Sequence, residues 1–256
     1  MPHTLLDNLH RREEICYLVI EDPSKDLKRD KEGYISEWIS RTGKANAVAD
    51  DVYRGKDITK LPNDRYAISF QKDVFSLDDG TVVPRIPQSG GYLCVTFRTS
   101  ATHKQVIVST REDPVSNGYE EIYVTGTEIG IVSSIGRPSD PYIRIIQNVN
   151  HNVWTTLFLG YIGGKKEITY TYNINNVTSG SFAMPCVSER EDSCALGGRY
   201  DGTYCFSGEI ASFETYYMED FRHDEMVIPS RLWPLIISNQ MIKKETSCLS
   251  TYDMEQ

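Results

Sequence analysis

The sequence predicts an all-β protein, an antiparallel two-sheet β-sandwich (jelly roll) with short helical segments near the termini. Stretches in which apolar and polar residues alternate with a period of two recur along the 256 residues, as expected for strands buried on one face. Gly, Pro, Asn and Asp residues that favour tight turns separate these stretches at short intervals. No helical pattern stands between them, which argues against a parallel sheet of alternating strands and helices.

The composition excludes several classes of function. Hydrophobic residues make up 39% of the chain, enough to bury a core, so a wholly disordered protein is excluded. The chain has 27 Lys and Arg against 36 Asp and Glu, for a formal net charge of -9, and carries no basic stripe. We therefore expect no binding to nucleic acid. No apolar run reaches the roughly 18–20 residues that cross a bilayer, so we expect no membrane insertion.

The chain divides into one domain and two short ends. We predict a β-sandwich over residues 34–242, an N-terminal extension over residues 1–33 and a polar C-terminal tail over residues 243–256. Charges interrupt residues 1–14 before an apolar stretch can form, so no signal peptide is predicted. The location of the protein stays open, with the extracellular space or a virion surface as the settings we consider.

Helical patterns are confined to the two ends. Apolar residues loosely spaced within residues 4–17 predict one or two amphipathic turns, and residues 220–228 predict a short helix that Pro229 ends. The densely charged residues 21–33 between the first helix and the domain are interpreted as a solvated loop or linker.

The strands of the domain are predicted from their alternation. Residues 91–97 are typical, because Leu93, Val95 and Phe97 fall on one face. The predicted strands cover residues 66–70, 91–97, 104–109, 119–124, 128–133, 142–146, 153–161, 167–174 and 208–217. We expect six aromatic rings to fill the space between the two layers: Trp38, Phe70, Phe97, Trp154, Phe206 and Phe213.

Cysteine usage predicts no metal knuckle and no redox motif. The chain has six cysteines and no C-x-x-C pair, and its five histidines form no zinc-binding pattern. Buried free thiols are one interpretation, and a single local disulfide within residues 186–205 is the other.

Three passages resemble the concanavalin A-like lectin/glucanase superfamily and, within it, laminin G-like (pentraxin-type) jelly-roll domains. They are ISEWISRTGKANA at residues 35–47, NHNVWTTLF at residues 150–158, and ALGG at residues 195–198 followed by FSGEIASFETYY at residues 206–217. The glycines Gly197 and Gly198 suit a close approach or a positive φ at a strand end, and Gly208 suits a bend where the chain changes sheets. The resemblance covers about residues 34–240 and implies a fold, which does not by itself fix a function.

The resemblance implies a lectin-like recognition module whose partner is a glycan or a cell-surface protein. Aromatic rings and planar polar side chains in loops are suited to sugars, although tyrosines also serve as strand packing. The candidate ligand-binding residues are Asn117, Tyr119, Tyr200, Asp201 and Tyr204. A viral or phage-type attachment or adhesion component, forming a homo-oligomer, is the setting that we consider.

Calcium is the one cofactor that the resemblance leaves open. Related domains bind this hard cation at the rim through Asp and Asn oxygens. The candidate ligands are Asp113, Asp140 and Asp201, and solvated turn residues are the alternative interpretation.

We predict that the protein is not an enzyme. The glycosidases of this superfamily place paired carboxylates on one strand face in an E-x-D-x-E segment, and no such segment is present. Glu209 and Glu214 are five residues apart, so regular alternation puts them on opposite faces. Two alternatives to a recognition module stay open: a structural or assembly protein that uses the sandwich as a scaffold, and a glycoside hydrolase with carboxylates gathered from distant strands.

Overall fold

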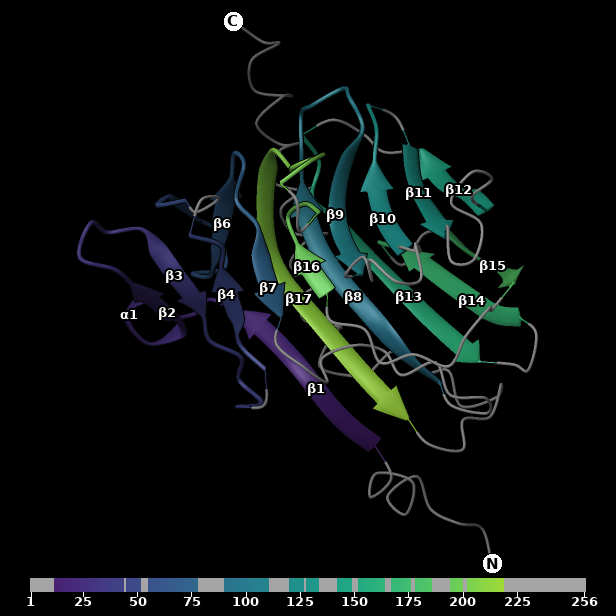
Figure 1. Cartoon of the computed structure of the whole chain (residues 1–256), viewed down its shortest axis with the longest axis horizontal. Helices are drawn as coiled ribbons and strands as arrows, with labels where there is room; N and C mark the ends of the chain where they lie inside the picture. Colours follow the sequence, from purple (N-terminus) through teal and green to yellow (C-terminus); the bar gives the residue numbers. More distant parts are fainter. Residues whose placement is uncertain are drawn as a thin grey trace, which may run out of the picture.

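Two antiparallel β-sheets stacked on each other form the protein, which confirms the predicted fold class (Figure 1). The computed structural model describes residues 12–43, 45–51, 55–77, 90–110, 120–126, 128–133, 142–148, 152–163, 167–175, 178–185, 194–199 and 202–218. Within these residues no helix has the length and apolar character needed to span a bilayer.

The first sheet contains eight strands and includes both the longest strand and the first one. In spatial order they are β15 (Thr178–Pro185), β14 (Glu167–Ile174), β13 (Thr155–Gly163), β8 (Gly90–Arg98), β17 (Gly208–Met218), β6 (Tyr66–Phe70) and β5 (Ile58–Lys60), with β1 (Arg12–Val19) also paired to β17.

The second sheet contains nine strands. In spatial order they are β12 (Tyr142–Asn148), β11 (Glu128–Ser133), β10 (Glu120–Val124), β9 (Gln105–Thr110), β16 (Cys194–Leu196), β7 (Phe75–Leu77), β4 (Ala47–Ala49), β3 (Ile35–Trp38) and β2 (Leu27–Arg29). One short helix, α1 (Pro23–Asp26), precedes β2, and the side chain of Asp22 caps it by accepting a hydrogen bond from the amide of Ser24.

The core lies between the sheets, where the alternating apolar residues meet. On β8 the predicted face of Leu93, Val95 and Phe97 joins the main cluster of buried residues, and Arg98 belongs to the outer face. Five of the six rings expected in the core belong to this cluster, and all are at most 1% exposed: Trp38, Phe70, Phe97, Phe206 and Phe213.

Trp154 is buried as predicted, but outside the main core. It packs with Leu61, Ala67 and Ala211 in a separate cluster. Ala67 alternates with Ile68, which faces the main core, so this cluster lies on the outer face of the first sheet.

The helix predicted over residues 4–17 is wrong for the part of it that the structure describes. Residues from Arg12 onward form β1, which pairs with β17 along residues 212–218. Cys16, Leu18 and Ile20 alternate with a period of two and are fully buried in the main core, and this burial outweighs the loose helical spacing of the leucines. Residues 12–20 of the predicted extension are therefore continuous with the sandwich. Residues 27–29 form β2 of the second sheet and residues 23–26 form α1, so the interpretation of residues 21–33 as a solvated loop or linker is wrong for these segments.

Gly197 and Gly208 both lie where the backbone closely approaches other atoms, as the sequence predicts. Gly197 has φ +91°, and an added Cβ would lie 2.4 Å from the ring of Phe70. Gly208 begins β17 after the chain has left the second sheet at β16, and an added Cβ there would lie 2.3 Å from the carbonyl oxygen of Arg98. Among the described cysteines, both members of the 186–205 stretch, Cys194 and Cys205, carry free thiols.

Candidate functional site

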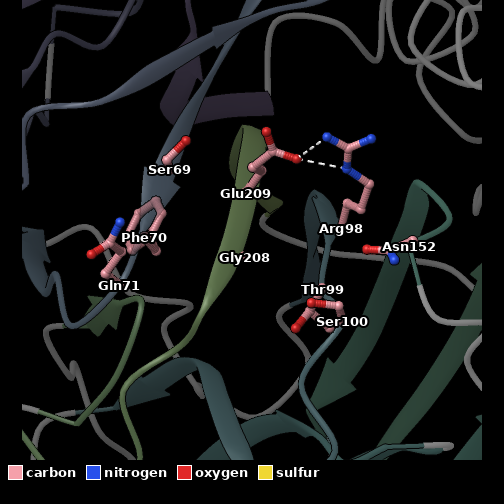
Figure 2. Close-up of a pocket in the computed structure, with 9 residues that line it drawn as sticks. All are labelled: Ser69, Phe70, Gln71, Arg98, Thr99, Ser100, Asn152, Gly208 and Glu209. Atoms are coloured by element: carbon pink, nitrogen blue, oxygen red, sulfur yellow. Dashed lines mark hydrogen bonds and ion pairs between the residues drawn. The ribbon is translucent and has the colours of Figure 1, made fainter.

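A polar pocket of about 400 Å³ opens at one end of the first sheet, where β6, β8 and β17 lie side by side. Figure 2 shows Ser69, Phe70 and Gln71 on one side and Arg98 with Asn152 on the other, with Glu209 between them. The nine lining residues are Ser69, Phe70, Gln71, Arg98, Thr99, Ser100, Asn152, Gly208 and Glu209.

An ion pair forms the centre of this pocket. The Nε of Arg98 donates a hydrogen bond to Oε2 of Glu209 at 2.6 Å, and a second guanidinium nitrogen contacts the same oxygen (Figure 2). The Arg98 side chain is 34% exposed and that of Glu209 is 15% exposed, so both charged groups can be reached by a ligand. The guanidinium lies over the ring of Trp154, 5.0 Å from its centroid, and this cation–π contact fixes its orientation.

A β-bulge places Glu209 on the same face as Arg98. Ile210 pairs with Phe97 and Ser212 pairs with Thr96, so Ala211 is an extra residue in β17. The bulge therefore puts Glu209 and Glu214 on the same outer face, and the expectation of opposite faces is wrong.

These two carboxylates are nonetheless too far apart for glycosidase chemistry. Their partners on β8 are Arg98 and Cys94, four residues apart, which corresponds to about 13 Å along a strand. Glycosidase carboxylates lie about 5–9.5 Å apart. Glu214 is 1% exposed and accepts a hydrogen bond from the hydroxyl of Tyr92 at 2.9 Å, so it is a buried structural group.

Three further side chains of the pocket are available for a ligand. Within the described residues, the side-chain amides of Gln71 and Asn152 and the hydroxyl of Ser100 have no hydrogen-bond partner. Asn152 adopts φ +56°, a left-handed conformation that Asn tolerates, and its backbone amide donates to the carbonyl of Thr99 at 3.0 Å. This turn is thus tied to the residue that follows β8, and Asn152 lies at the pocket wall (Figure 2).

The loops that border the pocket are joined by hydrogen bonds. The hydroxyl of Thr99 donates to the carbonyl of Ser207 at 2.6 Å and accepts from the amide of Ala101 at 3.1 Å. The amide of Ser207 donates to the side-chain carbonyl of Gln105 at 2.9 Å. The residues after β8 and those before β17 therefore form one fixed rim.

The chemistry of this arrangement is recognition by hydrogen bonds. Amide groups, a hydroxyl and an ion pair offer donors and acceptors within one small pocket, which is the combination that orients a polar ligand. Glu209 is the one carboxylate among its lining residues, and it is already engaged with Arg98. Among the described residues no group of three or more metal-ligating side chains is present.

Most of the ligand and metal residues predicted from the sequence fall outside the described residues. They are Asp113, Asn117, Tyr119, Asp140, Tyr200 and Asp201. Tyr204 is described, and this residue is 47% exposed. It belongs to the loop before β17 and is not among the residues that line the pocket. Its ring lies 5.1 Å from Lys104 and 4.6 Å from Arg199, which both pair with Glu121 on β10 of the second sheet.

Sequence reasoning missed the residues that form the pocket. Arg98 carries a weak signal, because it directly follows the predicted strand 91–97, and continued alternation puts it on the face opposite to Leu93, Val95 and Phe97. Gln71 and Asn152 carry none, since isolated amides next to strand ends are common in any β protein.

Comparison with known proteins establishes the fold. No protein-family model and no curated protein sequence matches this chain. Domain 4 of AbnA, a GH43 extracellular arabinanase from Geobacillus stearothermophilus solved in complex with arabinotriose, is similar with a TM-score of 0.52 and 17% identity, over 82% of this chain and 94% of that chain. The binding domain of botulinum neurotoxin serotype D is similar with a TM-score of 0.50 and 10% identity, over 82% of this chain and 49% of that chain. At these identities the similarity shows a shared β-sandwich fold.

Proposed function

We propose that this protein is a non-enzymatic glycan-binding module that holds its ligand in the pocket at the end of β6, β8 and β17. The observation that carries the proposal is the set of polar groups gathered there: the Arg98–Glu209 ion pair beside the available amides of Gln71 and Asn152. Sugar hydroxyls both donate and accept hydrogen bonds, and side chains of this kind match them in pairs.

A glycan array, followed by calorimetry, tests the proposal. Arabinotriose is the first soluble probe, because it is the ligand of one protein with this fold. We expect the wild-type chain to bind at least one glycan and the double variant Gln71→Ala, Asn152→Ala to bind it at least tenfold more weakly, which corresponds to about 1.4 kcal/mol. Asn63→Ala, in a turn outside the pocket, is the matched control and should bind like the wild type. An array without binders, or equal loss in the control, contradicts the proposal.

The same samples test the glycoside hydrolase alternative. Incubation of each bound glycan with the protein should leave its length unchanged, since the pocket offers one carboxylate that is engaged with Arg98. Shortened products would overturn the non-enzymatic assignment.

The biological setting and the assembly state are further parts of the proposal. We propose attachment to glycans at a cell or virion surface, by a viral or phage-type component that forms a homo-oligomer. Light scattering measures the oligomeric state directly, and a monomer at the concentration of the binding assay would contradict the proposed homo-oligomer. Calcium dependence is measured by repeating the calorimetry with a chelator, because the candidate ligands Asp113, Asp140 and Asp201 lie outside the described residues.

A further inference from the structure

The large apolar side chains that remain exposed all belong to one face of the protein. Within the described residues they are Val48, Ile143, Ile145 and Tyr204, with between 38% and 57% of their surface accessible. Val48 follows Ala47, whose side chain faces the core, so Val48 points outward from the second sheet. Ile143 and Ile145 pair with the two neighbours of Ile131, which also faces the core, so they point outward too. Exposed apolar residues gathered on one face mark an interaction surface, whereas single scattered ones do not.

Tyr204 belongs to this outer face, although it lies in a loop. The amide of Val106 on β9 donates a hydrogen bond to the carbonyl of Tyr204 at 2.8 Å, which places Tyr204 directly beside β9. Its backbone adopts φ +52°, a left-handed conformation that is rare for a large side chain. The ring packs against Lys104 and Arg199, and both cations bind Glu121 on β10. These contacts hold the exposed ring on the outer face.

Ile145 and Tyr204 stand at the two ends of one row of residues that crosses β12, β11, β10 and β9 (Figure 1). Ile145 on β12 pairs with Gly130 on β11, which pairs with Tyr123 on β10. Tyr123 in turn pairs with Val106 on β9, next to Tyr204. The ring of Tyr123 lies on Gly130, since a Cβ added to this glycine would be 2.2 Å from Cζ of the ring. Tyr123 and Val106 are buried, so the exposed side chains of the row are those at its two ends.

Charges of opposite sign lie on the two sides of Tyr123. Beside β9, Lys104 and Arg199 share the single carboxylate of Glu121, so one positive charge is in excess there. On β11, Glu128 faces Tyr123: burial raises the pKa of the Tyr123 phenol, and the charge of Glu128 raises it further. Among the described residues no cation pairs with the carboxylate of Glu128. The outer face therefore carries a cation and a carboxylate that can each accept a partner from another molecule.

A second copy of the chain, placed face to face, matches both the apolar ends and the charges. A two-fold axis parallel to β10 at Tyr123 sets β9 of one copy opposite β11 of the other, because these strands flank β10 at the same spacing. Lys104 directly precedes β9 and Glu128 begins β11, and both strands run antiparallel to β10, so the two charges lie at the same end of β10. Each Lys104 thus faces the partner's Glu128. Tyr204 and Ile145 are each one strand further out, so the same axis sets them opposite each other.

We infer that the outer face of the second sheet is the interface of a two-fold homodimer, in which Tyr204 packs against the partner's Ile145 and Lys104 pairs with the partner's Glu128. Each contact occurs twice, because a two-fold interface uses the same surface of both copies. The inference does not depend on glycan binding, since Arg98 and Glu209 of the pocket lie on the outer face of the first sheet. It names the surface through which the proposed homo-oligomer forms.

The edge of β12 offers the one competing mode of association that the described strands suggest. β12 is the last strand at its end of the second sheet, and an edge strand can pair with the same strand of another copy. Such edge-to-edge pairing would involve Ile145 but neither Tyr204 nor Glu128, which lie on other strands or loops. Variants at these three positions therefore separate the two modes.

Sedimentation velocity over a series of protein concentrations tests the inference by measuring the Kd of the dimer. We expect Ile145→Lys and Tyr204→Ala each to raise this Kd at least about tenfold, because every substitution removes two contacts. Glu128→Lys should raise it as well, since it sets a positive charge against the partner's Lys104. Val48→Lys is the matched control: Val48 is exposed on the same face, but β4 lies four strands from β10 and the partner's sheet ends two strands from it, at β12. It should dimerise like the wild type.

The outcomes separate this interface from the other proposals. A wild-type chain that stays monomeric at about 100 μM overturns the inference together with the homo-oligomer, and the glycan pocket stands. A loss of association in Ile145→Lys alone shows edge-to-edge pairing of β12 and overturns the face-to-face dimer, as does an equal loss in Val48→Lys. Circular dichroism checks that each variant is folded, and each should bind the array-selected glycan like the wild type. An array without binders removes the glycan function and leaves the dimer interface intact.

Discussion

Replacing Arg98 with alanine is the sharpest test of the pocket, because the structure predicts a small loss of stability and a large loss of binding. The Arg98 side chain is 34% exposed, so its ion pair with Glu209 is screened by water and contributes about 0–1 kcal/mol to stability. Its contact with Trp154 adds about 0.5–1 kcal/mol. We therefore expect Arg98→Ala to lower the free energy of unfolding by about 0.5–2 kcal/mol and to leave the protein folded.

Binding should respond more strongly than stability. A hydrogen bond from a charged group is worth about 1.5–3 kcal/mol when its partner is left without a donor, so the Kd should rise about 10- to 100-fold. Arg98→Lys should recover only part of the affinity, because an ammonium lacks the planar fork of a guanidinium. Calorimetry with the array-selected glycan gives the Kd, and urea titration gives the stability.

Arg41→Ala is the matched control for this experiment. The Arg41 side chain is 38% exposed and pairs with Glu21 at 2.9 Å and with Asp26 at 3.2 Å, outside the pocket. It should lower stability by a similar amount and leave the Kd unchanged. An Arg98→Ala protein that binds like the wild type would refute the reasoning, as would an equal loss of binding in Arg41→Ala.

The remaining predictions concern the scaffold and are measured by urea unfolding. Phe206→Ala should lower the free energy of unfolding by about 3–5 kcal/mol, because this fully buried ring contacts two neighbouring phenylalanine rings edge-on. A loss under about 1 kcal/mol would contradict the burial of Phe206 in the core. Gly197→Ala should lower the free energy of unfolding more than Gly43→Ala, because both glycines have a positive φ but only the added Cβ at position 197 would contact other atoms. Equal losses of stability would show that the crowding at Gly197 is relieved without strain. Burial raises the pKa of the Asp73 carboxyl above 3.8, so the folded chain binds this proton more tightly than the unfolded chain does. The stability that this group contributes is therefore fully present below the pKa of the unfolded chain, and it is lost as the pH rises through the pKa of the folded chain. Asp73→Asn should remove that loss of stability as the pH rises above about 4, the pKa of an Asp in the unfolded chain, and an unchanged slope means that another group causes it.

The parts of the fold that follow from alternation could be predicted from the sequence. Residues 91–97 lie in β8 with Leu93, Val95 and Phe97 inside, because burial of one strand face places apolar residues at every second position of the sequence. Residues 12–17 belong to the segment 4–17, whose loosely spaced apolar residues predict amphipathic turns, and pairing with β17 makes them part of a strand instead. Short strands such as β16 lie in segments too brief for any periodic signal.

The pocket could not be predicted, for a different physical reason. Its residues come from β6, β8, β17 and the turn at Asn152, and their proximity depends on which strands pair. Tyr204 is predicted as a ligand residue because an aromatic residue in a loop suits a sugar ring, and it stays a prediction. Neither its left-handed φ nor the two cations that hold it has a local sequence signature.

The extra residue Ala211 has a consequence for how this protein can vary. It reverses the inside–outside order of β17 at one point, so that Glu209 faces the pocket while Phe213 faces the interior. Deleting this single alanine would reverse the side-chain orientation in one half of the strand, so that either Ile210 or Phe213 would be exposed to water. A descendant could exchange Glu209 for another side chain and acquire a new specificity, but it could not shorten this strand by one residue and keep both the pocket and the interior.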